Sequence, residues 1–192
     1  LRTSSKSVHQ FNTFKETAKN LFYTCSDLLG STAGYVALLS DDGQENEVLF
    51  LEAGGRPCTV PHDYPMPIRG LRAESYQFNK VVFDNDFMNS KWVDFLPGGH
   101  VTLDNVLFSP LVLDDVTVGI IGLANKPGGF SDEDAALALI FGELAAIALR
   151  NSRLLENICI GEAREKELRQ AAEQANVAKS EFLANMSHEI RT

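Results

Sequence analysis

The chain has 192 residues, 44% of them hydrophobic, and a formal net charge of −9 from 17 Lys and Arg against 26 Asp and Glu. That is enough for one domain of ordinary size plus an extension. The negative balance, with no basic stripe, argues against nucleic acid or an anionic membrane as a main partner, because both bind clustered positive charge.

The N-terminal stretch predicts a helix and then a hairpin. Apolar residues recur at three- and four-residue steps over 7–29 and Gly30 supplies a stop, which predicts an amphipathic helix. Two short β-rich runs, 34–40 and 47–53, are separated by the turn sequence Asp-Asp-Gly-Gln. We expect them to pair as an antiparallel hairpin.

The middle of the chain predicts a long connection and little regular structure. Four of the seven prolines lie within 54–77, which indicates a connection that crosses a sheet face, with one helical turn near 68–74. The run 80–84 predicts a third strand. Residues 85–103 are aromatic and are expected to be irregular.

Two strong strands are predicted next, over 105–113 and 116–125. Gly119 and Gly122 in the second strand would leave room for another backbone or a ligand to approach.

A long helix is predicted to begin at Ser131, an N-cap residue followed by acidic residues. The helical pattern runs from Asp132 to Thr192 with Gly161 as an isolated weak point, and so long a run without caps favours a parallel two-chain coiled coil. The expected partner is therefore a second copy of the chain, paired through this C-terminal helix. The predicted seam is Leu144, Ile147, Leu154, Ile158, Leu168, Ala172, Ala175 and Phe182.

The cysteines indicate a reducing compartment. Cys25, Cys58 and Cys159 are odd in number and widely spaced, so they form neither a disulfide framework nor a zinc pattern, and no metal site is predicted. No run approaches 18 apolar residues, so no membrane contact is expected within the chain. We expect a cytoplasmic protein, and the chain reads as part of a longer one.

The predicted order of elements, over residues 7 to about 152, resembles a GAF domain. The run Gly122-Leu123-Ala124-Asn125-Lys126, followed by Phe130, is similar to the Asn-Lys…Phe…Asp signature of that family. Ser90-Lys91-Trp92 and Gly98-Gly99-His100 resemble a bacterial and archaeal subgroup. The resemblance implies an α+β fold, an antiparallel sheet flanked by helices. It also implies that Asn125, Lys126 and Asp134 tie the last strand to the exit helix.

The same resemblance implies a ligand between the sheet and the crossing loops, within residues 56–108. The alternative is that the aromatic residues fill a small core and no ligand exists. Cys58 could ligate haem iron, with His62 or His100 as second ligand, or respond to oxidants. Candidates for an apolar wall are Tyr64, Phe83, Phe87, Trp92, Phe95 and Phe108, and candidates for polar contacts are Arg69, Arg72, His100 and Asp104.

The last stretch of the chain carries one reactive side chain in a specific setting. Phe182, Met186 and Ile190 fall on one helical stripe, and His188 points away from it. An exposed imidazole is largely neutral at pH 7, so one ring nitrogen can act as a nucleophile. Glu189 beside it can accept the other ring N–H.

The sequence Lys-Ser-Glu-Phe-Leu-Ala-Asn-Met-Ser-His-Glu-Ile-Arg-Thr at the end of the chain resembles the phosphoacceptor helix of sensor histidine kinases. The resemblance implies that His188 is phosphorylated and that Glu189 is its acid/base partner. It further implies ATP and Mg²⁺ in a separate kinase domain and a response-regulator receiver domain as phosphoryl acceptor. We expect the chain alone to be inactive, since no phosphate-binding loop is present in it.

This reading divides the chain into a GAF sensory domain at 1–152, a coiled-coil linker at 153–176 and the start of the dimerisation and phosphoacceptor domain at 177–192. A ligand-free dimerisation scaffold and a cysteine-dependent redox enzyme on the GAF fold are the alternatives.

Overall fold

The computed structural model describes the backbone of residues 3–61 and 64–190 and the side chains of residues 14–61 and 64–180. The chain divides into two compact units. Residues 9–152 form one, and residues from Arg153 onward form the other with the first eight residues.

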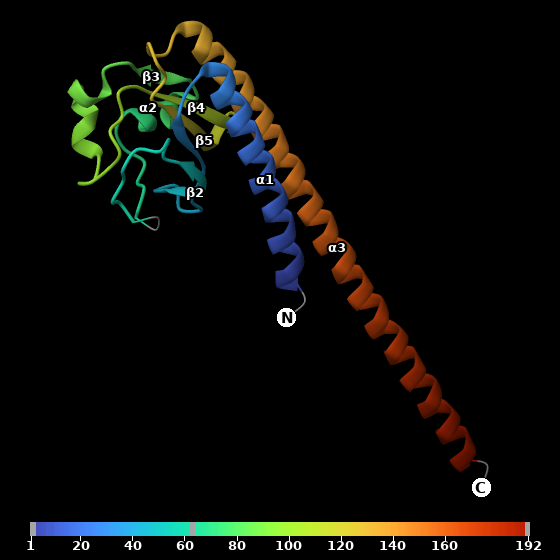
Figure 1. Ribbon diagram of the computed structural model, residues 1–192. Coiled ribbons are helices and arrows are strands. Elements are labelled where there is room, and N and C mark those ends of the chain that lie inside the picture. The colour runs from blue at the N-terminus through green and yellow to red at the C-terminus, as the bar shows by residue number, and fades with distance from the viewer. Residues whose placement is uncertain (1–2, 62–63, 191–192) are drawn as a thin grey trace. The chain divides into compact units, whose positions relative to one another are not determined.

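The larger unit is built on one antiparallel sheet in the order β2-β1-β5-β4-β3 (Figure 1). The predicted strands are confirmed, with ends shifted by one or two residues. The hairpin of β1 and β2 pairs Tyr35 with Leu51, and the pair of β4 and β5 sets Phe108 opposite Gly122. The strands are β1 (Ala33–Leu39), β2 (Asn46–Glu52), β3 (Val82–Asp84), β4 (Val106–Leu113) and β5 (Val116–Ala124).

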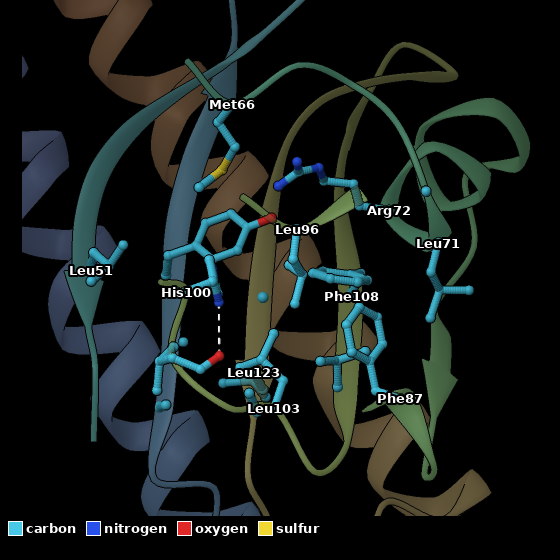
Figure 2. Close-up of a pocket in the computed structure, with 18 of the residues that line it drawn as sticks. Leu51, Met66, Leu71, Arg72, Phe87, Leu96, His100, Leu103, Phe108 and Leu123 are labelled. Carbon is cyan, nitrogen blue, oxygen red and sulfur yellow. Dashed lines mark hydrogen bonds between the residues drawn. The ribbon is translucent and has the colours of Figure 1, made fainter. Parts of the chain in front are cut away.

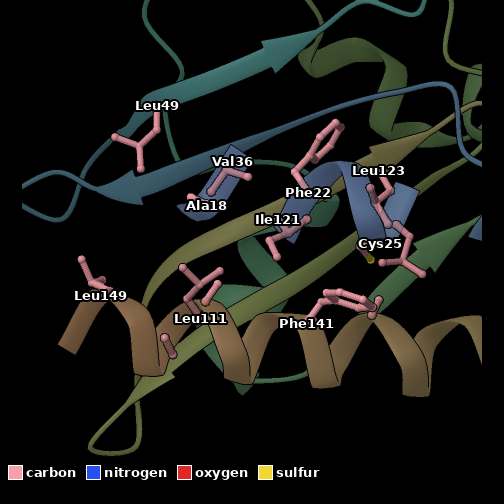
Figure 3. Close-up of a cluster of buried hydrophobic side chains, with 14 of the residues drawn as sticks. Ala18, Phe22, Cys25, Val36, Leu49, Leu111, Ile121, Leu123, Phe141 and Leu149 are labelled. Carbon is pink, nitrogen blue, oxygen red and sulfur yellow. The ribbon is translucent and has the colours of Figure 1, made fainter. Parts of the chain in front are cut away.

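Two helices cover one face of this sheet (Figures 1 and 3). They are α1 (Thr3–Leu29) and the first turns of α3 (Asp132–Ile190). Period-two alternation turns every second strand residue toward them, so Val36, Ile121 and Leu111 are buried in this layer. From the helices come Phe14, Ala18, Phe22, Cys25, Ala138, Phe141, Ala145 and Leu149. Cys25 is 0% exposed and belongs to this layer.

The start of α3 is fixed by a reciprocal cap. The backbone N–H of Asp134 donates to Ser131 Oγ at 3.2 Å, and the backbone N–H of Ser131 donates to Asp134 Oδ2 at 2.8 Å. From there α3 continues as one helix to Ile190, as the absence of stop signals predicted.

In the second unit, this helix exposes the apolar positions of the predicted seam, Leu154, Ile158 and Leu168. Of the helices that the structure describes, α3 alone is long and apolar enough to cross a membrane by length and composition, although no run of that kind was expected. One third of its most apolar 18-residue stretch is buried in the protein.

The opposite face of the sheet carries shorter elements: α2 (Leu71–Phe78) and the 3-10 helices η1 (Phe87–Asn89) and η2 (Lys91–Phe95). The single helical turn predicted near 68–74 is wrong in place and length. The helix starts only after Gly70, where φ is 68°, and ends at Asn79, whose left-handed φ of 50° closes its last turn.

Candidate ligand-binding site

A predominantly apolar pocket of about 120 Å³ lies between the sheet and the elements on its second face (Figure 2). Alternation places Tyr35 of β1 and Phe108 of β4 on this face. From across the pocket, α2 contributes Leu71 and Arg72, and η1 contributes Phe87. Other residues that line it include Leu51, Met66, Trp92, Phe95, Leu96, His100, Val101, Leu103 and Val106.

A second hollow of about 320 Å³ adjoins this pocket. It is bounded by the proline-rich connection that includes Pro61, Tyr64 and Pro65. The two hollows share nine lining residues, which are Leu51, Ala53, Cys58, Met66, Arg69, Arg72, Phe95, Leu96 and His100. The inner chamber is therefore continuous with a wider outer one.

The glycines of β5 make room for protein groups. A Cβ at Gly122 would lie 2.7 Å from a ring carbon of Tyr35, so this ring occupies the space that the missing side chain leaves. At Gly119 the space is taken by the backbone, because a Cβ there would stand 2.7 Å from the Ala37 carbonyl oxygen.

Two polar atoms of the pocket wall are buried without a hydrogen-bond partner in the described part of the chain: the Tyr35 hydroxyl and Arg72 Nε. A neighbouring hydroxyl, that of Tyr76, donates to Asn46 Oδ1 at 2.5 Å. Burial is the main cause that raises the pKa of Tyr76; Tyr35 adds to the rise and the positive charge of Arg72 opposes it. Tyr35 and Arg72, which both line the chamber, thus both act on the Tyr76 hydroxyl.

The other polar groups at the pocket have partners. Arg69 Nη2 donates to the Phe95 carbonyl oxygen at 3.0 Å. His100 Nδ1 lies 2.8 Å from the Val101 carbonyl oxygen (Figure 2), so this nitrogen is the donor and Nε2 stays available. Glu52, the one carboxylate among the described residues that line the pocket, accepts from the Gly54 N–H at 3.1 Å.

Most of the predicted pocket residues line the chamber, and three do not. Phe83 packs in the helix-covered layer, because its partner in the ladder is Leu107 and not Phe108. Asp104 is held outside by Arg56, whose Nη2 lies 2.6 Å from its carboxylate. Tyr64 lines only the outer hollow. Those that line the chamber are Cys58, Arg69, Arg72, Phe87, Trp92, Phe95, His100 and Phe108.

The cysteines are separated by the fold. Cys58 is exposed at the rim shared by both hollows, Cys25 is buried on the opposite face of the sheet, and Cys159 belongs to the second unit. His62 lies outside the described residues. Within those residues no group of three or more His, Cys, Asp or Glu could hold a metal ion.

The predicted signature residues make definite contacts. The ammonium of Lys126 pairs with the Asp134 carboxylate, which links the end of β5 to α3. Asn125 instead serves the loop before β4: its Oδ1 accepts from the Asp104 N–H at 2.8 Å and its Nδ2 donates to the Thr102 carbonyl oxygen at 3.1 Å. His188 and Glu189 are part of the helical backbone of α3, and their side chains lie outside the described residues.

A sheet with a helical layer on one face and an apolar pocket under shorter elements on the other is an α+β domain with room for a small molecule. The model of the GAF domain matches residues 12–150, and the chain belongs to the GAF domain family.

Comparisons with individual proteins agree on the fold. The chain is 34% identical over 90 residues to hybrid signal transduction histidine kinase G of Dictyostelium discoideum, a match over 46% of this chain and 3% of that protein. The GAF domain of a phosphoenolpyruvate-protein phosphotransferase from Coxiella burnetii superposes with a TM-score of 0.63 at 13% identity, over 80% of this chain and 94% of that one. A type II free methionine-R-sulfoxide reductase from Thermoplasma acidophilum superposes with a TM-score of 0.53 at 16% identity, over 72% and 96%.

Proposed function

We propose that the chain is the sensory input part of a cytoplasmic sensor histidine kinase. Its GAF domain would bind a small molecule and control ATP-dependent autophosphorylation of His188. The observation that carries the proposal is the joining, in one chain, of a domain with an apolar pocket to a helix that ends in the phosphoacceptor-like sequence. The histidine kinase relative, which this chain spans over only 3% of its length, supports the same assignment.

In this proposal the chemistry belongs to His188. Its neutral ring nitrogen attacks the γ-phosphorus of ATP bound with Mg²⁺ in a kinase domain, ADP leaves, and the phosphoryl group passes to an aspartate of a response-regulator receiver domain. Glu189 takes the ring proton. Two copies of the chain would pair through the exposed seam of α3, and ligand binding would bias one of two arrangements of that pair.

The experiment labels the protein that contains this chain with γ-labelled ATP. Label that is stable to base and labile to acid is expected, and His188→Gln should abolish it. Ser187→Ala, a change of the neighbouring nucleophile, should leave it intact. Persistence of the label in His188→Gln would contradict the proposal.

Two other functions, and haem as the ligand, are testable against this proposal. A cysteine-dependent redox enzyme would need a second thiol at the pocket, whereas Cys58 is the one cysteine that lines it. Haem ligation by Cys58 predicts a Soret band after addition of haem, lost in Cys58→Ala. A ligand-free scaffold predicts that pocket variants leave the labelling of His188 and its regulation unchanged.

A further inference from the structure

We propose that the pocket takes a small carboxylic acid with an apolar body, and that Arg72 and the Tyr35 hydroxyl hold its carboxylate. The inference rests on the proposed function, because it names the ligand class of the same pocket. It starts from the two buried polar atoms that find no partner in the described chain.

Arg72 carries the argument. Its side chain carries a guanidinium, and no acidic side chain among the described residues forms an ion pair with it. Glu52, which lines the same pocket, is bound to the Gly54 N–H. Figure 2 shows the Arg72 side chain extending from α2 over the pocket, toward the side where Met66 lies. A partly buried, unpaired charge is costly, so an anion there would be strongly favoured.

Tyr35 supplies a second donor at the pocket, and both Tyr35 and Arg72 act electrostatically on Tyr76. Its ring lies against Gly122, a position where any side chain would displace it, and its hydroxyl is buried with no partner among the described residues. A carboxylate can accept from a guanidinium and from a phenolic hydroxyl at once, because its two oxygens offer about four acceptor positions.

The apolar part of the pocket wall determines the size and polarity of the rest of the ligand. Leu71, Phe87 and Phe108 offer carbon surface, and the volume of about 120 Å³ is near that of the cavities of about 150 Å³ that hold a benzene ring. One aromatic ring or a short alkyl chain fits. A phosphate would bring more oxygens and a second charge, while Arg69, the other lining cation, already donates to Phe95.

The test uses the complete 192-residue chain and four probes. Benzoate and hexanoate carry the carboxylate; benzyl alcohol and 1-hexanol keep the apolar body without the charge. Dissociation constants are measured by calorimetric titration on wild type, Arg72→Met, Tyr35→Phe and Arg150→Met. The last variant is a matched control, because it removes one arginine charge at an exposed ion pair with Asp114, away from the pocket lining.

The acids should bind wild type and Arg150→Met equally. Arg72→Met should weaken acid binding by about ten- to a hundredfold, and Tyr35→Phe by about fivefold. Unfolding temperatures close to that of wild type verify that the variants are folded, and weakened binding by an unfolded variant does not count as support.

Three results would overturn the proposal: alcohols that bind as tightly as the acids, acid binding that is unchanged in Arg72→Met, or no binding by any probe at millimolar concentration. None of these three binding results changes the expected labelling of His188. Failure of the proposed ligand class can therefore be distinguished from failure of the kinase assignment.

Discussion

Gly142 of α3 lies directly against Pro110 of β4: a Cβ added to Gly142 would stand 2.4 Å from the Pro110 carbonyl oxygen. Beside this contact, the Ser109 hydroxyl donates to the Ala138 carbonyl oxygen at 2.8 Å. The helix is therefore held close to the sheet by a missing side chain and one buried hydrogen bond.

We expect Gly142→Ala to lower the free energy of unfolding by about 1 to 3 kcal/mol, because the added methyl group must push the helix off the sheet. That cost opposes a gain of about 1 kcal/mol in helix propensity. Urea unfolding of wild type and Gly142→Ala measures the net change in the free energy of unfolding. Gly161→Ala in the same helix meets nothing within 4 Å and should raise helicity, as followed by circular dichroism. Equal effects of the two changes would contradict the close contact at Gly142.

Asn125 should be needed for its backbone conformation as well as for its amide. Its φ is 59°, and its side chain bonds the backbone at Asp104 and Thr102. Asn125→Gly keeps the conformation and loses the bonds, whereas Asn125→Ala loses both. We expect the free energy of unfolding, measured in urea, to fall in both variants and to fall by about 1 kcal/mol more in Asn125→Ala than in Asn125→Gly. If Asn125→Ala proved more stable than Asn125→Gly, the left-handed backbone conformation would not be the reason for an asparagine at this position.

Asp134 should make stability depend on pH. Burial acts to raise its pKa, but hydrogen bonds from Lys126 and from the Ser131 N–H and hydroxyl outweigh burial, and the pKa is lowered from 3.8. A depressed pKa stabilises the folded chain above the unfolded value and loses that effect as pH falls through the folded one. The stability difference between wild type and Asp134→Asn should thus be full near pH 6 and shrink below about pH 4. If the stability difference between wild type and Asp134→Asn stays constant down to pH 2.5, it does not come from the ionised Asp134 carboxylate.

The thiols should differ in reactivity. Burial raises the pKa of Cys25 to about 12, so its thiolate is scarce at pH 8 and its sulfur is inaccessible. Iodoacetamide should modify Cys58 in the folded chain and Cys25 only in denaturant, as read by peptide mass spectrometry. Benzoate bound in the pocket should slow the modification of Cys58, which lies at its rim. Fast labelling of Cys25 in buffer would contradict the described core.

The exposed seam of α3 predicts self-association. Ile158→Glu should convert a dimer to a monomer in sedimentation measurements, because it places a charge in the predicted interface. Ile160→Glu is the matched control: Ile160 is also exposed but points about 200° away around the helix. A chain that is monomeric before any substitution, or one that is dissociated equally by both, would contradict the proposed pairing.

The strands and the outer helices could be predicted because their signals are local. Alternation, apolar steps and caps such as Ser131 act over a few neighbouring residues. The helix α2 was placed too early because its limits depend on the backbone of Gly70 and Asn79, which a pattern of side chains does not reveal.

The pocket could be predicted only in part. Aromatic residues of the loop, such as Trp92 and Phe95, line the pocket as proposed. They could be proposed without knowing a strand register, because a loop residue does not alternate between the two faces of a sheet. Phe83 and Phe108 both look like wall residues in sequence, but the register pairs Phe108 with Val82 and turns Phe83 to the helices. Tyr35 was missed, although its alternation with Val36 would have marked it as facing the other layer.

In β4, two consecutive residues face the two different layers of the domain. Phe108 borders the chamber, and the next residue, Ser109, is bonded to the first turns of α3. In the proposed function, a ligand that displaces the Phe108 ring would therefore shift the same short piece of backbone that anchors the helix. A small tilt of this single strand would then link the pocket directly to α3.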